Sequence, residues 1–134
     1  MLLDDSYLLG EEGALFIKKK MQELLENTTK LIEENIDISH HGWFVLKYEY
    51  FPKKYFILFE GEFNSFNIRI INQDNGFVAL KKLIDYPNIL RKADIVCAIE
   101  KMKEQLQLSI EFYKVIDDKL FRQVDGKYKR VKGW

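Results

Sequence analysis

The residues of this chain that could carry out acid-base chemistry are two histidines and two glutamates. His40 and His41 are adjacent and are the only histidines in the sequence. Glu60 and Glu62 lie two residues apart, so both carboxylates would project from the same side of one strand. A pocket joining a histidine to one of these carboxylates could act as a general acid-base pair. The sequence therefore leaves open a small enzyme that uses these four side chains.

The same residues can also be explained by structural roles that require no catalytic site. The adjacent histidines lack the i,i+4 spacing of a helical metal site. Lys47 and Arg69 are expected across the strands from the glutamates, where they would form a charge lattice. Cys97 has no basic or histidine neighbour that would mark a nucleophile, and "GEEG" at 10–13 places acids where phosphate oxygens would sit. We therefore expect no enzyme, no metal ligand and no cofactor.

The composition is that of one globular domain. The chain has 134 residues, of which 47% are hydrophobic and 31% charged. This length suits a single core, so we expect one α+β domain over residues 1–134. No apolar run approaches the roughly 20 residues of a spanning helix, and Asp4 and Asp5 stand where a signal peptide would be basic. With a single cysteine as well, we expect a cytoplasmic protein that does not use a membrane.

Two long segments show the 3.6-residue period of amphipathic helices. The first runs from about residue 12 to 35, and its apolar stripe falls at Ala14, Ile17, Met21, Leu24, Thr28, Leu31 and Ile32. The second runs from about residue 94 to 107, with Asp94 as its expected N-cap. Residues 77–84 are expected to add a short helix. Both long helices should pack on the same face of a sheet.

The period changes from 3.6 to 2 in the segments that should form this sheet. Residues 43–50, 55–62 and 66–71 are predicted to form an antiparallel meander, with turns at "FPKK" and "EFNS". Residues 110–131 alternate again, and "DGK" at 125–127 is a strong hairpin signal. We therefore expect an antiparallel sheet of about five or six strands, made of the meander at 43–71 and the strands at 110–131.

The turn positions imply a register for the meander. If Tyr50 faces Tyr55 across the first turn and Glu62 faces Ser65 across the second, the side chains sort by parity onto two faces. The predicted core face is apolar and aromatic: Phe44, Leu46, Tyr48, Tyr50, Tyr55, Ile57, Phe59, Phe66, Ile68 and Ile70. The other face mixes charges with large apolar groups: Trp43, Val45, Lys47, Glu49, Phe56, Leu58, Glu60, Glu62, Asn67, Arg69 and Ile71.

This mixed face carries too much apolar area for a surface that meets only water and too many charges for a core. It is therefore either partly covered by the C-terminal strands or a place where a partner protein docks. A Trp and a Phe among charges match an interface core with a polar rim. The residues expected to bind a partner are Trp43, Lys47, Glu49, Phe56, Leu58, Glu60, Glu62 and Arg69. Homodimerisation through this face stays open.

Charge is unevenly distributed although the formal net charge is zero. Residues 1–35 hold eight acids against four lysines, whereas residues 114–134 hold seven basic residues against three aspartates. An accessory protein for nucleic acid could use this basic end, and its contacts would be Lys119, Arg122, Lys127, Lys129, Arg130 and Lys132. A neutral domain lacks the broad positive field of such proteins, so we favour protein binding over this alternative.

The layout also resembles a known family. A small α+β domain that is poor in alanine and rich in Lys, Ile, Phe and Asn, with a long helix, a meander and a second helix, looks like the bacterial immunity proteins that neutralise polymorphic toxins. The resemblance covers the layout and composition of residues 12 to 107. It implies a noncatalytic inhibitor that blocks a toxin domain by complementary charge and shape, and it assigns no role to an individual residue.

Overall fold

The computed structural model describes residues 7–37 and 42–132, which form three helices and eight strands. Their order is α1 (Gly10–Leu25), β1 (Thr29–Ile36), β2 (Phe44–Tyr50), β3 (Tyr55–Glu62), β4 (Ser65–Ile71), β5 (Phe77–Ala79), α2 (Leu80–Leu83), α3 (Lys92–Leu106), β6 (Tyr113–Ile116), β7 (Lys119–Val124) and β8 (Lys127–Arg130). The predicted α+β class is confirmed. None of the described helices has the length and apolar character that a membrane crossing requires.

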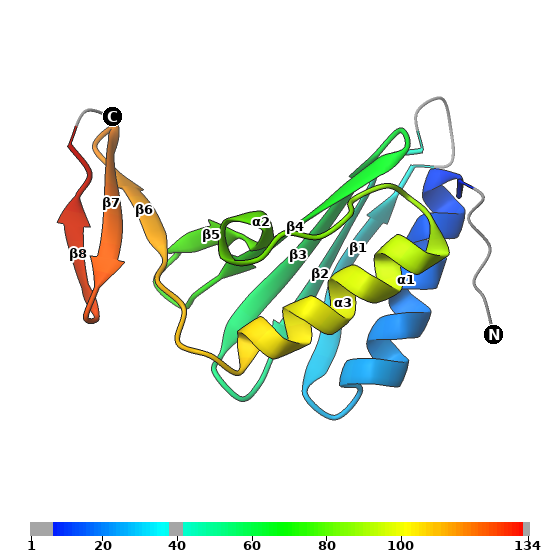
Figure 1. Ribbon diagram of the computed structural model, residues 1–134, viewed down its shortest axis with the longest axis horizontal. Coiled ribbons are helices and arrows are strands. Elements are labelled where there is room, and N and C mark those ends of the chain that lie inside the picture. The colour runs from blue at the N-terminus through cyan, green and yellow to red at the C-terminus, as the bar shows by residue number, and fades with distance from the viewer. Residues whose placement is uncertain (1–6, 38–41, 133–134) are drawn as a thin grey trace.

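The strands form one open antiparallel sheet in which each strand lies beside its neighbour in sequence, in the order β1 to β8. The helices lie in front of this sheet in Figure 1, where α1 and α3 run side by side. The sheet has eight strands rather than the predicted five or six. The difference comes mainly from β1 and β5, because the sequence pattern placed both of these segments in helices.

The predicted register of the meander is confirmed. Tyr50 pairs with Tyr55 across the first turn, and Glu62 pairs with Ser65 across the second. Burial alternates along β2, β3 and β4 as this register requires. Every residue of the predicted core face is buried except Tyr55, which is half-buried and packs against that core. The alternation of side chains along the strands therefore predicted correctly which residues pack against the helices.

The two main helices bury the apolar stripes that amphipathic periodicity assigns to them. From α1 the buried side chains are Ala14, Ile17, Met21 and Leu25, and from α3 they are Asp94, Ile95, Ala98, Ile99, Met102 and Leu106. The expected boundaries of the second helix, 94 to 107, are correct to within two residues. The expected cap is wrong, because Arg91 occupies the N-cap position. Asp94 lies in the first turn, where it accepts hydrogen bonds from the Ile89 amide and the Arg91 guanidinium.

The prediction of one helix over residues 12–35 is wrong in its second half, because α1 ends at Leu25 and β1 follows. Thr28 and Thr29 cause this break. Both hydroxyls donate to the Leu25 carbonyl, at 3.1 and 2.9 Å, and so satisfy the last carbonyl of the helix. β-Branched residues then favour the extended conformation. The apolar residues that continued the helical stripe are half-buried (Leu31) or exposed (Ile32) on the new strand.

Residues 77–84 also differ from the expected single helix. Phe77–Ala79 add a short strand to β4, and only Leu80–Leu83 form a helical turn, α2. The strand places Val78 in the core and leaves Phe77 half-buried on the opposite side. This strand connects the meander to the C-terminal part of the sheet, so it is needed for the sheet to continue.

The C-terminal strands at 113–130 extend the sheet and project from its end, as Figure 1 shows. We call β6, β7 and β8 the arm. A single residue pair, Phe77 with Tyr113, joins β5 to β6. The predicted "DGK" hairpin is confirmed, because Asp125 and Gly126 both have positive φ, as a tight two-residue turn requires. Unlike the meander, the arm contains no buried side chain.

Candidate interaction surface

The outer face is the side of β2, β3 and β4 that points away from the buried core. Its side chains are those assigned by parity: Trp43, Val45, Lys47, Glu49, Phe56, Leu58, Glu60, Glu62, Asn67, Arg69 and Ile71. Trp43, Glu62 and Asn67 are exposed, and the other members are half-buried. The sequence left open whether the C-terminal strands cover this face. They continue the sheet beside it.

Trp43 lies at one end of the outer face, immediately before β2. Its carbonyl accepts a hydrogen bond from the Asp37 amide at 2.8 Å, which ties this backbone to the end of β1. The indole is 38% exposed. It lines a shallow depression of about 400 Å³ together with Val45, Glu60, Glu62 and Asn67, among others. This depression combines a large aromatic side chain with two carboxylates and an amide.

Two contacts organise the centre of the outer face. The Arg69 guanidinium donates to one oxygen of Glu60 through Nε at 3.0 Å and Nη2 at 2.6 Å. The Lys47 ammonium lies 4.8 Å from the centroid of the Phe56 ring, in cation-π geometry. Phe56 is therefore partly covered by a charge from the same face, and Trp43 is the more accessible of its two aromatic residues.

The expected charge lattice is present in part. Glu60 and Arg69 form its ion pair, whereas Glu49 and Glu62 have no ion-pair partner among the described residues. Both residues of the pair are more than 40% exposed, so it contributes about 1 kcal/mol of stability at most. Unpaired carboxylates beside an exposed indole are available to polar groups of a partner.

The outer face extends further than the sequence indicated. Paired residues of antiparallel strands share a face, and the pairs Phe56 with Ile71, Ile71 with Phe77, and Phe77 with Tyr113 form one continuous row. Phe56, Ile71 and Phe77 are half-buried apolar side chains of this row, and Tyr113, at which the row reaches the arm, also packs against the buried core. The sequence did not predict this row, because residues 77–84 were expected to form a helix. In a helix, Phe77 would not have continued the alternation of the strands.

The catalytic alternative depends on two histidines whose positions the structure does not describe. His40 and His41 lie outside the described residues, so the structure does not place them relative to Glu60 and Glu62. Glu60 is engaged by Arg69, as described above. Across residues 7–37 and 42–132, no three His, Cys, Asp or Glu side chains gather as a metal-binding group. Cys97 lies half-buried on α3.

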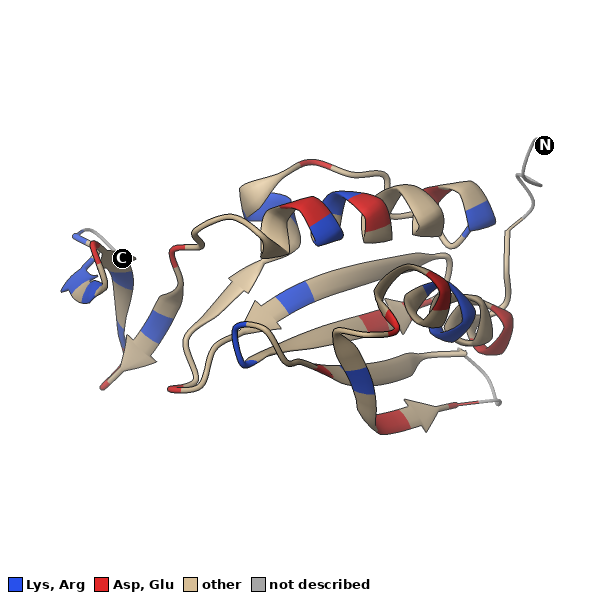
Figure 2. Ribbon diagram, turned by 90° about the horizontal axis from the view of Figure 1, so that it is seen from below, with Lys and Arg blue, Asp and Glu red and all other residues tan. Residues whose placement is uncertain are grey.

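The basic residues of the nucleic-acid alternative gather on the arm. Lys119 and Arg122 lie on β7, Lys127, Lys129 and Arg130 on β8, and Lys132 just beyond it, and all six are exposed. Figure 2 shows these charges grouped at one end of the molecule. Arg122 donates to Glu111 at 3.1 Å, which leaves the β8 side as the more open part of this basic surface.

Comparison with known proteins adds no relative to this description. No family model matches the chain, and neither the curated proteins nor the solved structures that were searched contain a match. Any function must therefore be argued from the surfaces described above.

Proposed function

We propose that the protein binds another protein, without catalysis, through the outer face of β2, β3 and β4. The observation that carries this proposal is Trp43. Trp43 is 38% exposed and lies beside a depression lined by Glu60 and Glu62. A large aromatic side chain surrounded by charged groups is typical of protein interfaces, which have an aromatic centre and a polar rim. Tryptophan in such a position commonly supplies a large share of binding energy.

The most concrete version of the proposal is a cytoplasmic immunity protein that neutralises a bacterial toxin domain. It rests on the resemblance of layout and composition described above. Inhibition by blocking requires a rigid surface of defined shape and charge. The outer face offers such a surface, because its strands are held on the other side by the buried core and its ion pair fixes Glu60 and Arg69.

The two sequence-based alternatives have less support. An enzyme would need a site that joins His40 or His41 to Glu60 or Glu62, and the Glu60 carboxylate is already bound by Arg69. Nucleic-acid binding on the arm would use exposed rings as well as cations. The Tyr128 ring lies under the Lys114 ammonium at 5.6 Å, and its hydroxyl is hydrogen-bonded to Asn72 and Asp74. We therefore favour a protein partner.

The test is affinity capture from the native cell, followed by mass spectrometry of what is retained. Three baits are compared: the unchanged protein, Trp43→Ala, and Leu108→Ala. Leu108 is 55% exposed after α3 and is not part of the outer face, so it is a matched control for loss of an exposed apolar side chain. We expect one defined protein on the unchanged bait and on Leu108→Ala, and its loss on Trp43→Ala.

The expected loss corresponds to about 30-fold in affinity, or about 2 kcal/mol. Each bait should remain folded with a cooperative unfolding transition, because Trp43 is not among the residues of the buried core. Equal retention by Trp43→Ala would refute the outer face as the binding surface. Retention of nucleic acid in place of a protein would favour the arm, and retention of neither would contradict the proposal as a whole.

A further inference from the structure

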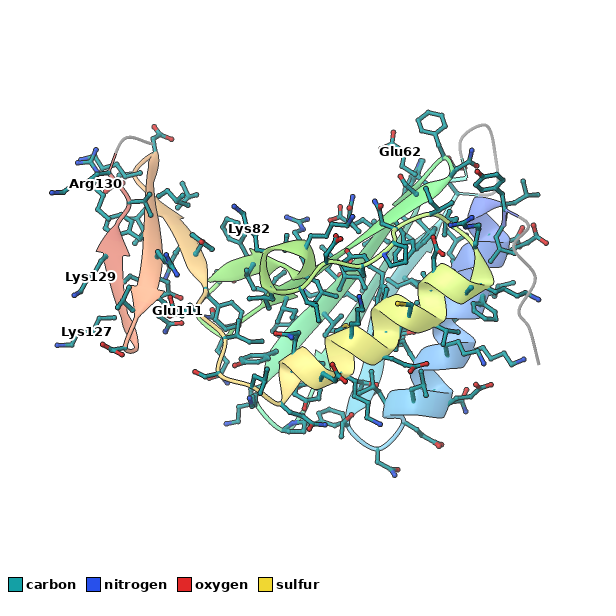
Figure 3. All side chains as sticks on the ribbon, in the orientation of Figure 1. Glu62, Lys82, Glu111, Lys127, Lys129 and Arg130 are labelled. Atoms are coloured by element: carbon teal, nitrogen blue, oxygen red, sulfur yellow. The ribbon has the colours of Figure 1, made fainter. Side chains whose placement is uncertain are left out.

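Within residues 7–37 and 42–132, the last strand of the sheet, β8, is an open edge lined with positive charge. Figure 3 shows Lys127, Lys129 and Arg130 projecting from this strand away from the rest of the molecule, at the far end from Glu62. None of these three side chains has an ion-pair partner among the described residues. This edge is therefore a surface separate from the depression beside Trp43, and what it binds can be considered independently of the proposed function.

The backbone of β8 has unpaired groups that face outward. In an antiparallel pair, alternate residues exchange hydrogen bonds with the neighbouring strand and the residues between them point the other way. The Val131 amide donates to the Leu120 carbonyl at 2.8 Å, and the tight turn at 125–126 pairs Val124 with Lys127. By the same alternation, the backbone N–H and C=O groups of Lys129 point toward β7. The N–H and C=O groups of Tyr128 and Arg130 therefore face the free edge.

The opposite edge of the sheet differs in ways that argue against pairing between two copies of this chain. The register of β1 shifts between Leu31 and Glu33, and such bulges obstruct the addition of a strand. Lys30 would repel the basic β8 edge of another copy, and Glu34 is already bound by Lys18 at 2.8 Å. Among the described residues Glu33 is therefore the one acidic side chain of β1 without an ion-pair partner. Two β8 edges would repel each other directly. The pairing within the β7–β8 hairpin, by contrast, shows no register shift.

The chemistry of β8 favours an extended acidic polypeptide. Charged side chains on an edge strand commonly prevent other strands from pairing with it. Positive charge does not prevent pairing with an acidic strand, because the two strands attract each other. Strand alternation places Lys127 and Lys129 on one face of β8 and Tyr128 and Arg130 on the other. An incoming strand would therefore meet cations on both faces, and beside Arg130 a tyrosine whose hydroxyl is held by Asn72 and Asp74. An extended polypeptide can pair its own N–H and C=O groups with those of this edge, whereas a nucleic acid has no such alternating main-chain groups.

We propose that the free edge of β8 binds an extended acidic segment of a partner protein by strand addition. The segment would place acidic side chains opposite Lys127 and Lys129 and an apolar side chain opposite Tyr128. Its backbone would bond to the N–H and C=O groups of Tyr128 and Arg130. Main-chain hydrogen bonds would provide affinity, and the charges would select the sequence.

The test uses the full chain and a fluorescent ten-residue peptide that alternates glutamate and valine, with both ends blocked. In antiparallel pairing, the orientation of every strand pair in this sheet, glutamates that face the lysines leave the valine amides directed at β8, because the valines lie opposite Tyr128 and Arg130. Methylating the valine nitrogens should therefore weaken binding about tenfold or more, since each lost hydrogen bond leaves an unsatisfied group. Methylating the glutamate nitrogens, which face away, should leave the affinity unchanged. Fluorescence anisotropy measures each dissociation constant.

Two charge variants complete the experiment. Lys127→Glu with Lys129→Glu should abolish binding, whereas Lys82→Glu with Lys103→Glu, which changes net charge equally at exposed helical positions, should retain it. No binding to the unchanged chain would overturn the proposal. Equal losses with both methylated peptides, equal losses with both charge variants, or equal affinity for a ten-nucleotide single-stranded RNA would also overturn it, because each result indicates nonspecific attraction of polyanions.

Discussion

The two faces of β2, β3 and β4 are built from the same strands and yet have opposite character. One face holds Phe44, Phe59 and Ile70, whose side chains are at most 1% exposed. The other holds Trp43, which is 38% exposed, and an ion pair whose two members are over 40% exposed. Because successive side chains of a strand point to opposite faces, one residue packs in the core while the next lies on the outer face. Mutations on the two faces should therefore separate stability from binding.

The largest effect is expected from Phe59→Ala on the core face. Phe59 is fully buried and packs edge-on against Tyr48, with ring centroids 5.8 Å apart. Removing the ring should lower the free energy of unfolding by about 3 to 5 kcal/mol, measured by urea denaturation. Phe51→Ala, at a residue that is 47% exposed, is the matched control and should cost far less. Similar losses in both variants would break the distinction between the faces.

A smaller loss of stability is expected from Gly61→Ala, which adds atoms to the same face. A Cβ at this position would overlap the Phe44 ring, so the two side chains cannot both keep their places. Overpacking of this kind costs about 1 to 3 kcal/mol, readable as a lower thermal midpoint. Adding Phe44→Leu should recover part of this loss in the double variant relative to the sum of the single changes. Strict additivity would show that the clash is relieved elsewhere.

Stability should also fall at high pH because of tyrosines on the core face. Burial raises the pKa of Tyr48 above its usual value of 10.0, and Glu34 raises it further. The unfolded chain therefore loses this proton at lower pH than the folded chain, so stability is fully present below about pH 10 and declines above it. Tyr48→Phe should make this decline shallower in denaturant titrations at several pH values. An equally steep decline in Tyr48→Phe would contradict this assignment.

The smallest change in stability is expected on the outer face itself. Glu60→Gln keeps the shape of the side chain and removes the charge that Arg69 binds. Because both partners are substantially exposed, the free energy of unfolding should change by less than about 1 kcal/mol. The same variant should lower retention of the partner more clearly than it lowers stability. A loss of several kcal/mol in urea denaturation would place the ion pair in the structural core of the protein.

The sequence was most informative where turns anchor the alternation. "FPKK" and "EFNS" set the pairing of Tyr50 with Tyr55 and of Glu62 with Ser65, and every other pair of the meander followed from them. A slip of one residue would have placed Phe59 in solvent and Glu60 in the core, so burial leaves only one register. The sequence alone therefore identifies the outer face of β2, β3 and β4 residue by residue.

The sequence misled where one apolar pattern fits two structures. Leu31 and Ile32 continue the helical stripe of Ile17 and Met21, but they belong to a strand. The decisive signal was the pair Thr28 and Thr29, whose hydroxyls bond to the helix end. β5 has only three residues, too few to show a period. The arm projects from the sheet because none of its side chains is buried against the core. The alternation of apolar and polar residues along a strand does not predict whether that strand will be covered.

The most direct test of the central claim is the affinity of the purified partner for Trp43→Ala, measured beside the unfolding of the same variant. The account predicts a dissociation constant about 30-fold weaker than that of the unchanged protein, with the free energy of unfolding changed by less than about 0.5 kcal/mol. An unchanged dissociation constant would contradict it. A variant that unfolds would contradict it equally, because Trp43 would then belong to the core.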